Sequence, residues 1–255
     1  MTIFEAIILG LVQGLTEFLP VSSSGHLIIF QNLFGMEEPM LTFDIFLHIG
    51  TLVAVFIVFW KDIWRLLKKP FCKEVALLIV ATIPVGIIGL LFDDKVAAIS
   101  TLTTVGICLI FTGVILFFSD RLTGRIKLNE LSFGKSLFIG LMQGIAVLPG
   151  VSRSGSTICA SLLCGLDRKE AARYSFLLSI LAILGAGLVH SLGIIQEHGS
   201  FSLSAEYIAG MAAAALSGFA AIKFFLKLLE KKSMRFFSYY CWSVAAIILI
   251  WNFVA

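Results

Sequence analysis

Long apolar stretches alternate with short polar segments along the whole chain. A helix needs about 20 predominantly apolar residues to cross the hydrocarbon core of a bilayer. The pattern is typical of helical spans rather than of barrel strands, in which apolar and polar residues alternate. It predicts six transmembrane helices, over residues 47–60, 75–92, 102–119, 175–195, 207–229 and 236–253.

Two further apolar stretches, residues 1–42 and 134–166, are interrupted midway by Pro, Gly and Ser. Each must begin and end on the same side of the membrane if the neighbouring spans are to fit. A broken stretch of this kind is a re-entrant hairpin, which is tolerated where protein or water covers its backbone. The predicted fold is therefore an all-α integral membrane protein with six transmembrane helices and two re-entrant helical hairpins.

The charged residues indicate the orientation of these segments. Apart from Lys95 and Arg153, every Lys and Arg lies in one of four clusters, within residues 61–73, 121–135, 168–173 and 223–235. The polar segments between the clusters are acidic. Because loops rich in Lys and Arg stay in the cytoplasm, the ends of the first hairpin are predicted outside and those of the second inside.

The two hairpins are copies of one another. A shift of 130 residues aligns Gly10–Gly35 with Gly140–Gly165 without a gap, and eleven of the 26 pairs are identical. The predicted halves are residues 1–119 and 134–255, each a hairpin followed by three spans, joined by a cytoplasmic linker over 120–133. Their opposite orientations make an inverted-topology repeat, whose interrupted helices often form a binding site near the midplane.

Composition supports this fold class and excludes others. Hydrophobic residues make up 59% of the chain and charged residues 14%, whereas soluble domains average about 25% charged residues. The five cysteines have no paired spacing, so we expect small core residues rather than disulfides or a metal site.

Arg153 is the residue that most strongly indicates function. An arginine within an apolar segment costs roughly 2.5–3.5 kcal/mol even on lenient insertion scales, so it needs an anionic partner. Its guanidinium suits phosphate oxygens, although a structural pair with Glu17 is the alternative. Hydroxyl groups around Arg153, and one at the matching position of the first hairpin, are predicted to bind phosphate with it: Ser22, Ser152, Ser154 and Thr157.

The first hairpin carries the other candidates for chemistry. Glu17 is its only interior acid and can be a metal ligand, a general base or the ion partner of Arg153. Oxygen ligands suit Mg²⁺ or Ca²⁺, and Gln13, one helical turn earlier, can add a neutral oxygen. His26 follows a run of serines and can act as base, acid or nucleophile.

The remaining histidines are weaker candidates. Asp44 and His48 form an i,i+4 pair near the outer end of a span, where they would line an entrance. His190 and His198 belong to no polar motif and are predicted to be structural residues.

At these residues the chain resembles the undecaprenyl-pyrophosphate phosphatase family, also called bacitracin-resistance proteins. The segment QGLTEFLPVSSSGH, residues 13–26, is similar to the (E/Q)xxxE signature and the Ser/His run of that family. The segment LPGVSRSGST, residues 148–157, is similar to its PGxSRSxxT signature. The similarity continues near 43–55 and 165–186 and in effect covers the whole chain.

The resemblance implies hydrolysis of undecaprenyl (C55 isoprenyl) diphosphate to the monophosphate and inorganic phosphate. This reaction recycles the lipid carrier of peptidoglycan synthesis and gives bacitracin resistance. The family roles map onto Glu17, Ser23, His26, Ser152, Arg153 and Thr157. A divalent cation, a bacterial cytoplasmic membrane and a site facing the outer, periplasmic side are also implied. Gln13 stands where many members have Glu, which removes one negative metal ligand.

Two questions stay open at this point. Either Ser23 or His26 attacks phosphorus, or one of them activates water. The same midplane anion site would also suit a polyprenyl-phosphate transporter or flippase, because inverted repeats are common in transporters. The expected partner is a membrane lipid and not nucleic acid, and the oligomeric state, including a homodimer, is undetermined.

Overall fold

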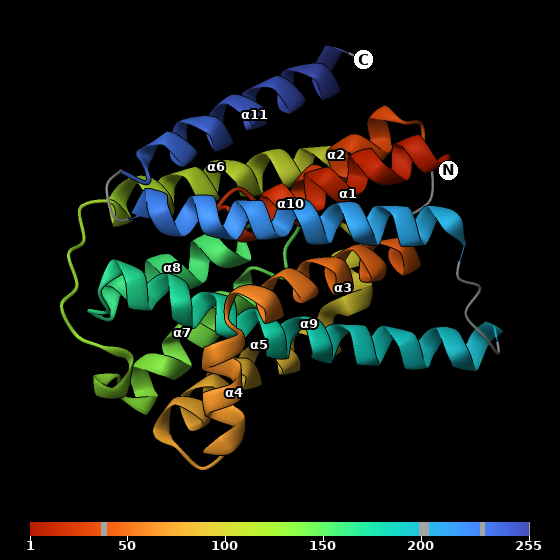
Figure 1. Ribbon diagram of the computed structural model, residues 1–255. Coiled ribbons are helices and arrows are strands. Elements are labelled where there is room, and N and C mark those ends of the chain that lie inside the picture. Colours follow the sequence, from red (N-terminus) through yellow and green to blue (C-terminus); the bar gives the residue numbers. More distant parts are fainter. Residues whose placement is uncertain (37–39, 199–203, 230–232, 255) are drawn as a thin grey trace.

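The computed structural model describes residues 1–36, 40–198, 204–229 and 233–254, and these ranges contain helices and no strand (Figure 1). The helices are α1 (Ile3–Phe18), α2 (Ser23–Leu33), α3 (Leu41–Val58), α4 (Trp60–Lys68), α5 (Lys73–Ala98), α6 (Leu102–Ser119), the 3₁₀ turn η1 (Leu128–Glu130), α7 (Phe133–Ile145), α8 (Arg153–Leu163), α9 (Arg168–His198), α10 (Ala205–Leu229) and α11 (Arg235–Val254). The predicted all-helical class is confirmed.

Five of these helices, α5, α6, α9, α10 and α11, are long and apolar enough to cross a membrane. The pair α3 and α4, bent by 80° between them, makes a sixth if it counts as one span. The chain is therefore a multi-pass membrane protein. The first predicted span, 47–60, starts too late, since α3 begins at Leu41. Asp44 and His48 interrupt the apolar pattern there, but they face the protein interior rather than lipid.

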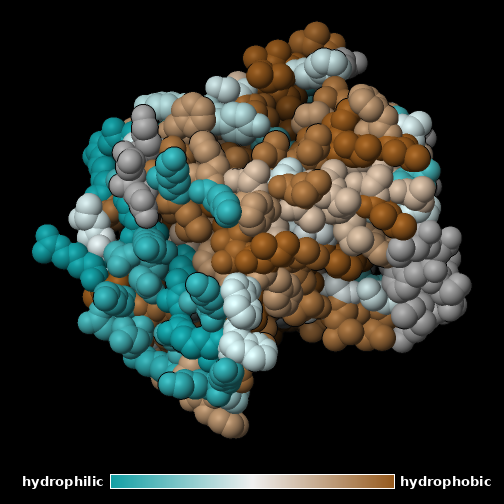
Figure 2. Space-filling view, viewed as in Figure 1, coloured by the Kyte–Doolittle hydropathy of each residue, from teal (hydrophilic) through white to brown (hydrophobic). Residues whose placement is uncertain are grey.

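The surface is divided between a polar end and an apolar body. Figure 2 shows hydrophilic side chains gathered at the lower left, over α4 and the beginning of α7, and hydrophobic side chains over much of the remaining face. The polar end carries basic residues of the clusters that the sequence predicts to be cytoplasmic, such as Arg65 and Lys68. The apolar body suits a lipid environment.

Each interrupted stretch folds as two helices joined by a tight turn. Ser22 caps the N-terminus of α2, where its hydroxyl accepts from the Gly25 N–H at 3.3 Å. Ser152 caps α8 in the same way, accepting from the Gly155 N–H at 3.0 Å. Serine is a preferred N-cap because its oxygen satisfies an N–H that the first helical turn leaves unpaired. The Ser-rich tips therefore restart a helix after each break.

Glycines let the first helix of each hairpin approach a long helix closely. A Cβ at Gly10 would lie 2.3 Å from the Gly210 carbonyl oxygen of α10, and one at Gly14 would lie 2.0 Å from the Ser217 hydroxyl. A Cβ at Gly140 of α7 would lie 2.4 Å from a carbonyl oxygen of α5. Small residues allow such contacts between membrane helices. Both hairpins thus pack closely against the long helices.

The two hairpin tips contact each other. Ser154, at the start of α8, donates its hydroxyl to the Leu19 carbonyl of the first hairpin at 3.0 Å. Thr112 of α6 donates to the Gly150 carbonyl and accepts from the Ser152 N–H, both at 3.0 Å. Segments about 130 residues apart in the chain therefore come together at one place, where the site lies.

Candidate active site

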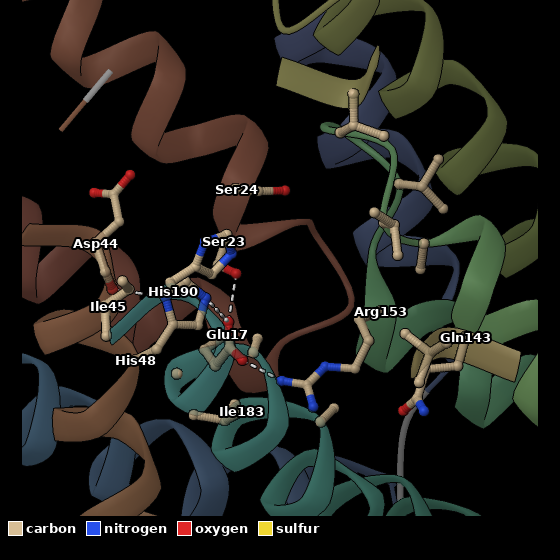
Figure 3. Close-up of a pocket in the computed structure, with 18 of the residues that line it drawn as sticks. Glu17, Ser23, Ser24, Asp44, Ile45, His48, Gln143, Arg153, Ile183 and His190 are labelled. Atoms are coloured by element: carbon tan, nitrogen blue, oxygen red, sulfur yellow. Dashed lines mark hydrogen bonds and ion pairs between the residues drawn. The ribbon is translucent and has the colours of Figure 1, made fainter. Parts of the chain in front are cut away.

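A cavity of about 370 Å³ lies beside the hairpin tips and is also lined by residues of α3, α5 and α9 (Figure 3). Much of its wall is apolar, with residues such as Ile45, Val85 and Ile183. The polar side chains that line it are Glu17, Ser23, Ser24, Asp44, His48, Gln143, Arg153 and His190. A largely apolar cavity with a few convergent polar groups is the usual form of a small-molecule site.

Glu17, in the last turn of α1, is the centre of the polar cluster. Its side chain is 3% exposed. Oε1 accepts from Arg153 Nη2, and Oε2 accepts from the Ser23 hydroxyl and from Gln13 Nε2 at 3.1 Å. A buried carboxylate is stable only when it is paired and hydrogen-bonded. Glu17, Ser23 and Arg153 therefore form one connected unit.

Arg153 is the first residue of α8 and reaches from the second hairpin across to the first. One arm of its guanidinium, Nη2, is paired with Glu17. The other arm, Nη1, is buried and has no hydrogen-bond partner among the described residues. An unpaired charged donor in a cavity wall costs free energy unless a ligand supplies an acceptor. Arg153 thus lines the cavity, is anchored to Glu17 and keeps one donor that the described side chains leave unsatisfied.

Ser23 opens α2, directly after the N-cap of that helix. Its hydroxyl donates to Glu17 Oε2, so the oxygen keeps its lone pairs while its proton already faces a base. This is the arrangement that activates a serine nucleophile: hydroxyl and base within hydrogen-bond reach, with the base oriented by further groups. Here Arg153 and Gln13 orient the base.

His48 and Asp44 also line the cavity. His48 Nδ1 lies 2.7 Å from the Asp44 carbonyl oxygen, which can only accept, so the proton is on Nδ1. Nε2 then faces Glu17 Oε2 at 3.8 Å. The ring therefore directs Nε2 toward the Glu17 cluster.

Three polar lining residues were not predicted as site residues: Ser24, Gln143 and His190. Gln143 is the repeat counterpart of Gln13, and that symmetry was the available signal. Its Oε1 is buried with no hydrogen-bond partner in the described structure. His190 follows Ala182 and Ala186 at four-residue spacing on the face of α9 that lines the cavity. A stripe of small residues that leads to a histidine was the signal there. The side chain of His198 lies outside the described residues.

The hydroxyl groups expected to bind phosphate lie behind the cavity wall instead of in it. Ser22 and Ser152 are N-caps. Ser154 donates to a backbone carbonyl of the other hairpin. The Thr157 hydroxyl bonds to the Arg153 carbonyl at 2.8 Å and lies 2.7 Å from the Ser175 hydroxyl. The structure therefore places these four in the framework of the tips, with Arg153 exposed to the cavity.

His26 does not join the cluster either. It lies beside a second hollow of about 300 Å³, between α1, α2 and α11. Its ring nitrogens are 2.7 Å from the Ser22 carbonyl oxygen and 2.8 Å from the Tyr240 hydroxyl. Of the four residues predicted to be catalytic, the structure brings together Glu17, Ser23 and Arg153.

Comparison with known proteins agrees with this geometry. A family profile described as "Bacitracin resistance protein BacA" matches residues 6–247. The chain is 47% identical to an undecaprenyl-diphosphatase of Halothermothrix orenii, over 98% of both chains. It is 44% identical to one of Carboxydothermus hydrogenoformans, over 98% of this chain and 97% of the relative. A third, of Methanobrevibacter smithii, is 43% identical over 98% of both chains. The chain belongs to the BacA family of bacitracin resistance proteins.

Proposed function

We propose that this protein hydrolyses undecaprenyl diphosphate to undecaprenyl phosphate and inorganic phosphate, within the cytoplasmic membrane of its cell. The observation that carries the proposal is the Glu17–Ser23–Arg153 cluster in the cavity wall. An anion-binding arginine and a serine with a neighbouring base are what phosphoryl transfer needs. Relatives that match over nearly their whole length are named for this activity.

The cavity continues into a groove that suits the isoprenoid tail. A neighbouring hollow of about 410 Å³ between α5 and α9 shares five lining residues with the cavity: Val85, Val147, Ala182, Ala186 and His190. Gly86, Gly89 and Gly185 also line it, and a Cβ at any of them would meet open space. The groove contacts exposed apolar residues such as Leu90. A lipid can therefore enter sideways and bring its diphosphate to Arg153.

The chemistry follows from the hydrogen bonds of Ser23. Its oxygen attacks the terminal phosphorus while its proton passes to Glu17 Oε2, and the bond from that phosphorus to the oxygen of undecaprenyl phosphate breaks. Water then cleaves the phosphoserine, and Glu17 returns the proton to Ser23. Arg153 Nη1 stabilises the charge on the transferred phosphoryl group. His48 Nε2, beside Glu17, is placed to exchange a proton with cavity water.

A divalent cation stays part of the proposal. No group of three or more His, Cys, Asp or Glu side chains in the described part of the chain could hold a metal ion. Gln13 Oε1, however, is a buried oxygen without a hydrogen-bond partner next to Glu17. Mg²⁺ is often bound by one or two carboxylates together with substrate phosphates. Glu17 and Gln13 would hold such an ion with the diphosphate oxygens, and it would neutralise diphosphate charge.

We also propose six spans, two re-entrant hairpins and inverted halves. The packing supports this reading because it is reciprocal. The first hairpin packs through α1 on α10 of the other half, and the second packs through α7 on α5 of the first half. The last spans, α6 and α11, pack together, and so do the first spans, α3 and α9. A two-fold relation between the halves would produce these pairings.

The cavity is proposed to open to the outer, periplasmic side. Asp44 lies near the start of α3, and Val96 and His190 lie near the ends of α5 and α9. Each of these positions is next to a segment whose acidic residues place it outside under the positive-inside rule. Substrate left on the outer leaflet would reach such a site without crossing the membrane.

Phosphate release from C55 diphosphate by the purified protein in detergent tests the proposed function. A hydrolase releases phosphate there, although detergent allows no gradient across a membrane. A transporter of polyprenyl phosphate would release none and would instead move labelled lipid across liposomes, which would overturn the proposal.

Gly185→Phe tests the groove. The added ring would occupy the space that the tail needs, so KM for C55 diphosphate should rise about tenfold, as expected when roughly 1.4 kcal/mol of apolar contact is lost. KM for the C15 analogue farnesyl diphosphate should change less, because less tail is displaced. Ala220→Phe, at an exposed position of α10 outside the groove, is the matched control. Equal effects on both chain lengths would place the tail elsewhere.

A further inference from the structure

His26 is buried but lies outside the cavity that holds Glu17 and Arg153. Nδ1 is 2.7 Å from the Ser22 carbonyl oxygen, and since a carbonyl only accepts, Nδ1 carries the proton. Nε2 is then the acceptor for the Tyr240 hydroxyl at 2.8 Å. The two rings are also stacked, with centroids 5.6 Å apart and planes 6° apart. The neutral ring therefore has one fixed tautomer and no nitrogen free for substrate.

The carbonyl held by His26 belongs to a strained residue. Ser22 has φ of 70°, and it is the one non-glycine residue with positive φ in the described part of the chain. That conformation costs about 1–3 kcal/mol and persists where its surroundings enforce it. The Ser22 carbonyl and the Ser23 N–H belong to the same planar peptide unit. A hydrogen bond to this carbonyl oxygen consequently fixes the orientation of the peptide unit from which the Ser23 side chain extends.

The second hairpin provides an internal comparison. Its residue equivalent to Ser22 is Ser152, which has ordinary extended backbone with φ of −73°. Its residue equivalent to His26 is Ser156, whose hydroxyl is buried without a hydrogen-bond partner in the described structure. The position equivalent to Ser23 is Arg153, which needs no alignment for attack. The contact with the His26 imidazole and the strained turn thus occur together, in the hairpin that carries Ser23.

We propose that His26 and Tyr240 form a positioning pair that holds the Ser22–Ser23 peptide so that the Ser23 hydroxyl points at Glu17. This inference rests on the proposed function, because it assigns the pair to the attacking serine. Tyr240 comes from α11, which no sequence motif connects with the site. The pair transfers no proton to substrate and acts through Ser23.

Substitutions at His26 separate positioning from proton transfer. His26→Asn keeps an N–H close to the place of Nδ1 but cannot carry a proton, so it should retain at least about a tenth of kcat. His26→Ala removes the bond and should lose roughly 100-fold, because the strained turn can relax. KM should stay within about twofold in both, since Arg153 is untouched. Loss in the Asn variant equal to that in the Ala variant would identify a proton carrier and overturn the proposal.

Tyr240→Phe tests the second contact, because it removes only the hydroxyl and should lower kcat about tenfold with KM unchanged. An unchanged kcat would overturn the proposed positioning role of Tyr240. Nitrogen-15 NMR of the histidine rings gives a readout that does not depend on activity. The wild-type His26 ring should show a proton on Nδ1, and a proton on Nε2 would overturn the inference. Wild-type protein that shows this tautomer but releases no phosphate would contradict the proposed function and leave the His26 contact established.

Discussion

Replacing Arg153 with alanine is expected to lower kcat/KM for phosphate release from C55 diphosphate by about 10³-fold or more. Removal of one well-placed charge-stabilising donor costs about 10²–10³-fold in enzymes, and arginines that stabilise phosphoryl transfer contribute about 10³–10⁵-fold. Two losses combine here. The phosphoryl group loses Nη1, and Glu17, whose side chain is 3% exposed, loses its ion partner. The measurement is steady-state phosphate release in detergent.

Two further variants test whether the loss of activity is specific to the Arg153 guanidinium. Arg153→Lys keeps the charge but loses the two-armed geometry, so its activity should lie between wild type and the alanine variant. Arg121→Ala removes an exposed arginine outside the cavity and should leave kcat/KM unchanged. Thermal unfolding in detergent, compared across all three, separates loss of chemistry from loss of fold. Wild-type activity in a folded Arg153→Ala protein would remove this residue from the mechanism.

The candidate residues that the structure brings together at the cavity include two whose charge conflicts with their apolar surroundings. Arg153 and Glu17 are charged residues in apolar segments, and a charge there needs a partner whatever the fold. Their pairing was one of the alternatives considered, and the structure shows it. Nη1 has no hydrogen-bond partner among the described residues, so the pair is compatible with the proposed anion binding.

Sequence could not assign the hydroxyl groups, because serine has two uses at a hairpin tip. Ser22 and Ser152 restart helices as N-caps, whereas Ser23 points into the cavity. A shift of one position along the chain decides between these two uses, and only the backbone dihedral angles show which serine is the N-cap. Nor could sequence place His26, since its partner Tyr240 is more than 200 residues away along the chain. His190 was missed for a similar reason: the polar residues that line the cavity with it come from other helices.

Ser23→Ala is expected to reduce kcat on the order of 10³-fold or more, because a nucleophile and its base act as one unit. Glu17→Gln should cause a loss of similar size, and the double variant should lose little more than either alone. Ser24→Ala is the matched control. Ser24 lines the same cavity and is next in the chain, but its hydroxyl lies 3.4 Å from that of Ser22 and makes no hydrogen bond to Glu17 in the described structure. Its kcat should stay within about tenfold of wild type, the range expected for loss of one neutral hydrogen bond.

The stereochemical course then decides how Ser23 acts. A terminal thiophosphate made chiral with oxygen isotopes reports each displacement at phosphorus as one inversion. Attack by Ser23 followed by attack of water gives two inversions, so the released thiophosphate should show net retention. Rapid quenching should also trap a phosphate group on Ser23 in wild type and not in Ser23→Ala. Net inversion would mean that water attacks directly, with Glu17 as its base and the Ser23 hydroxyl only orienting that carboxylate.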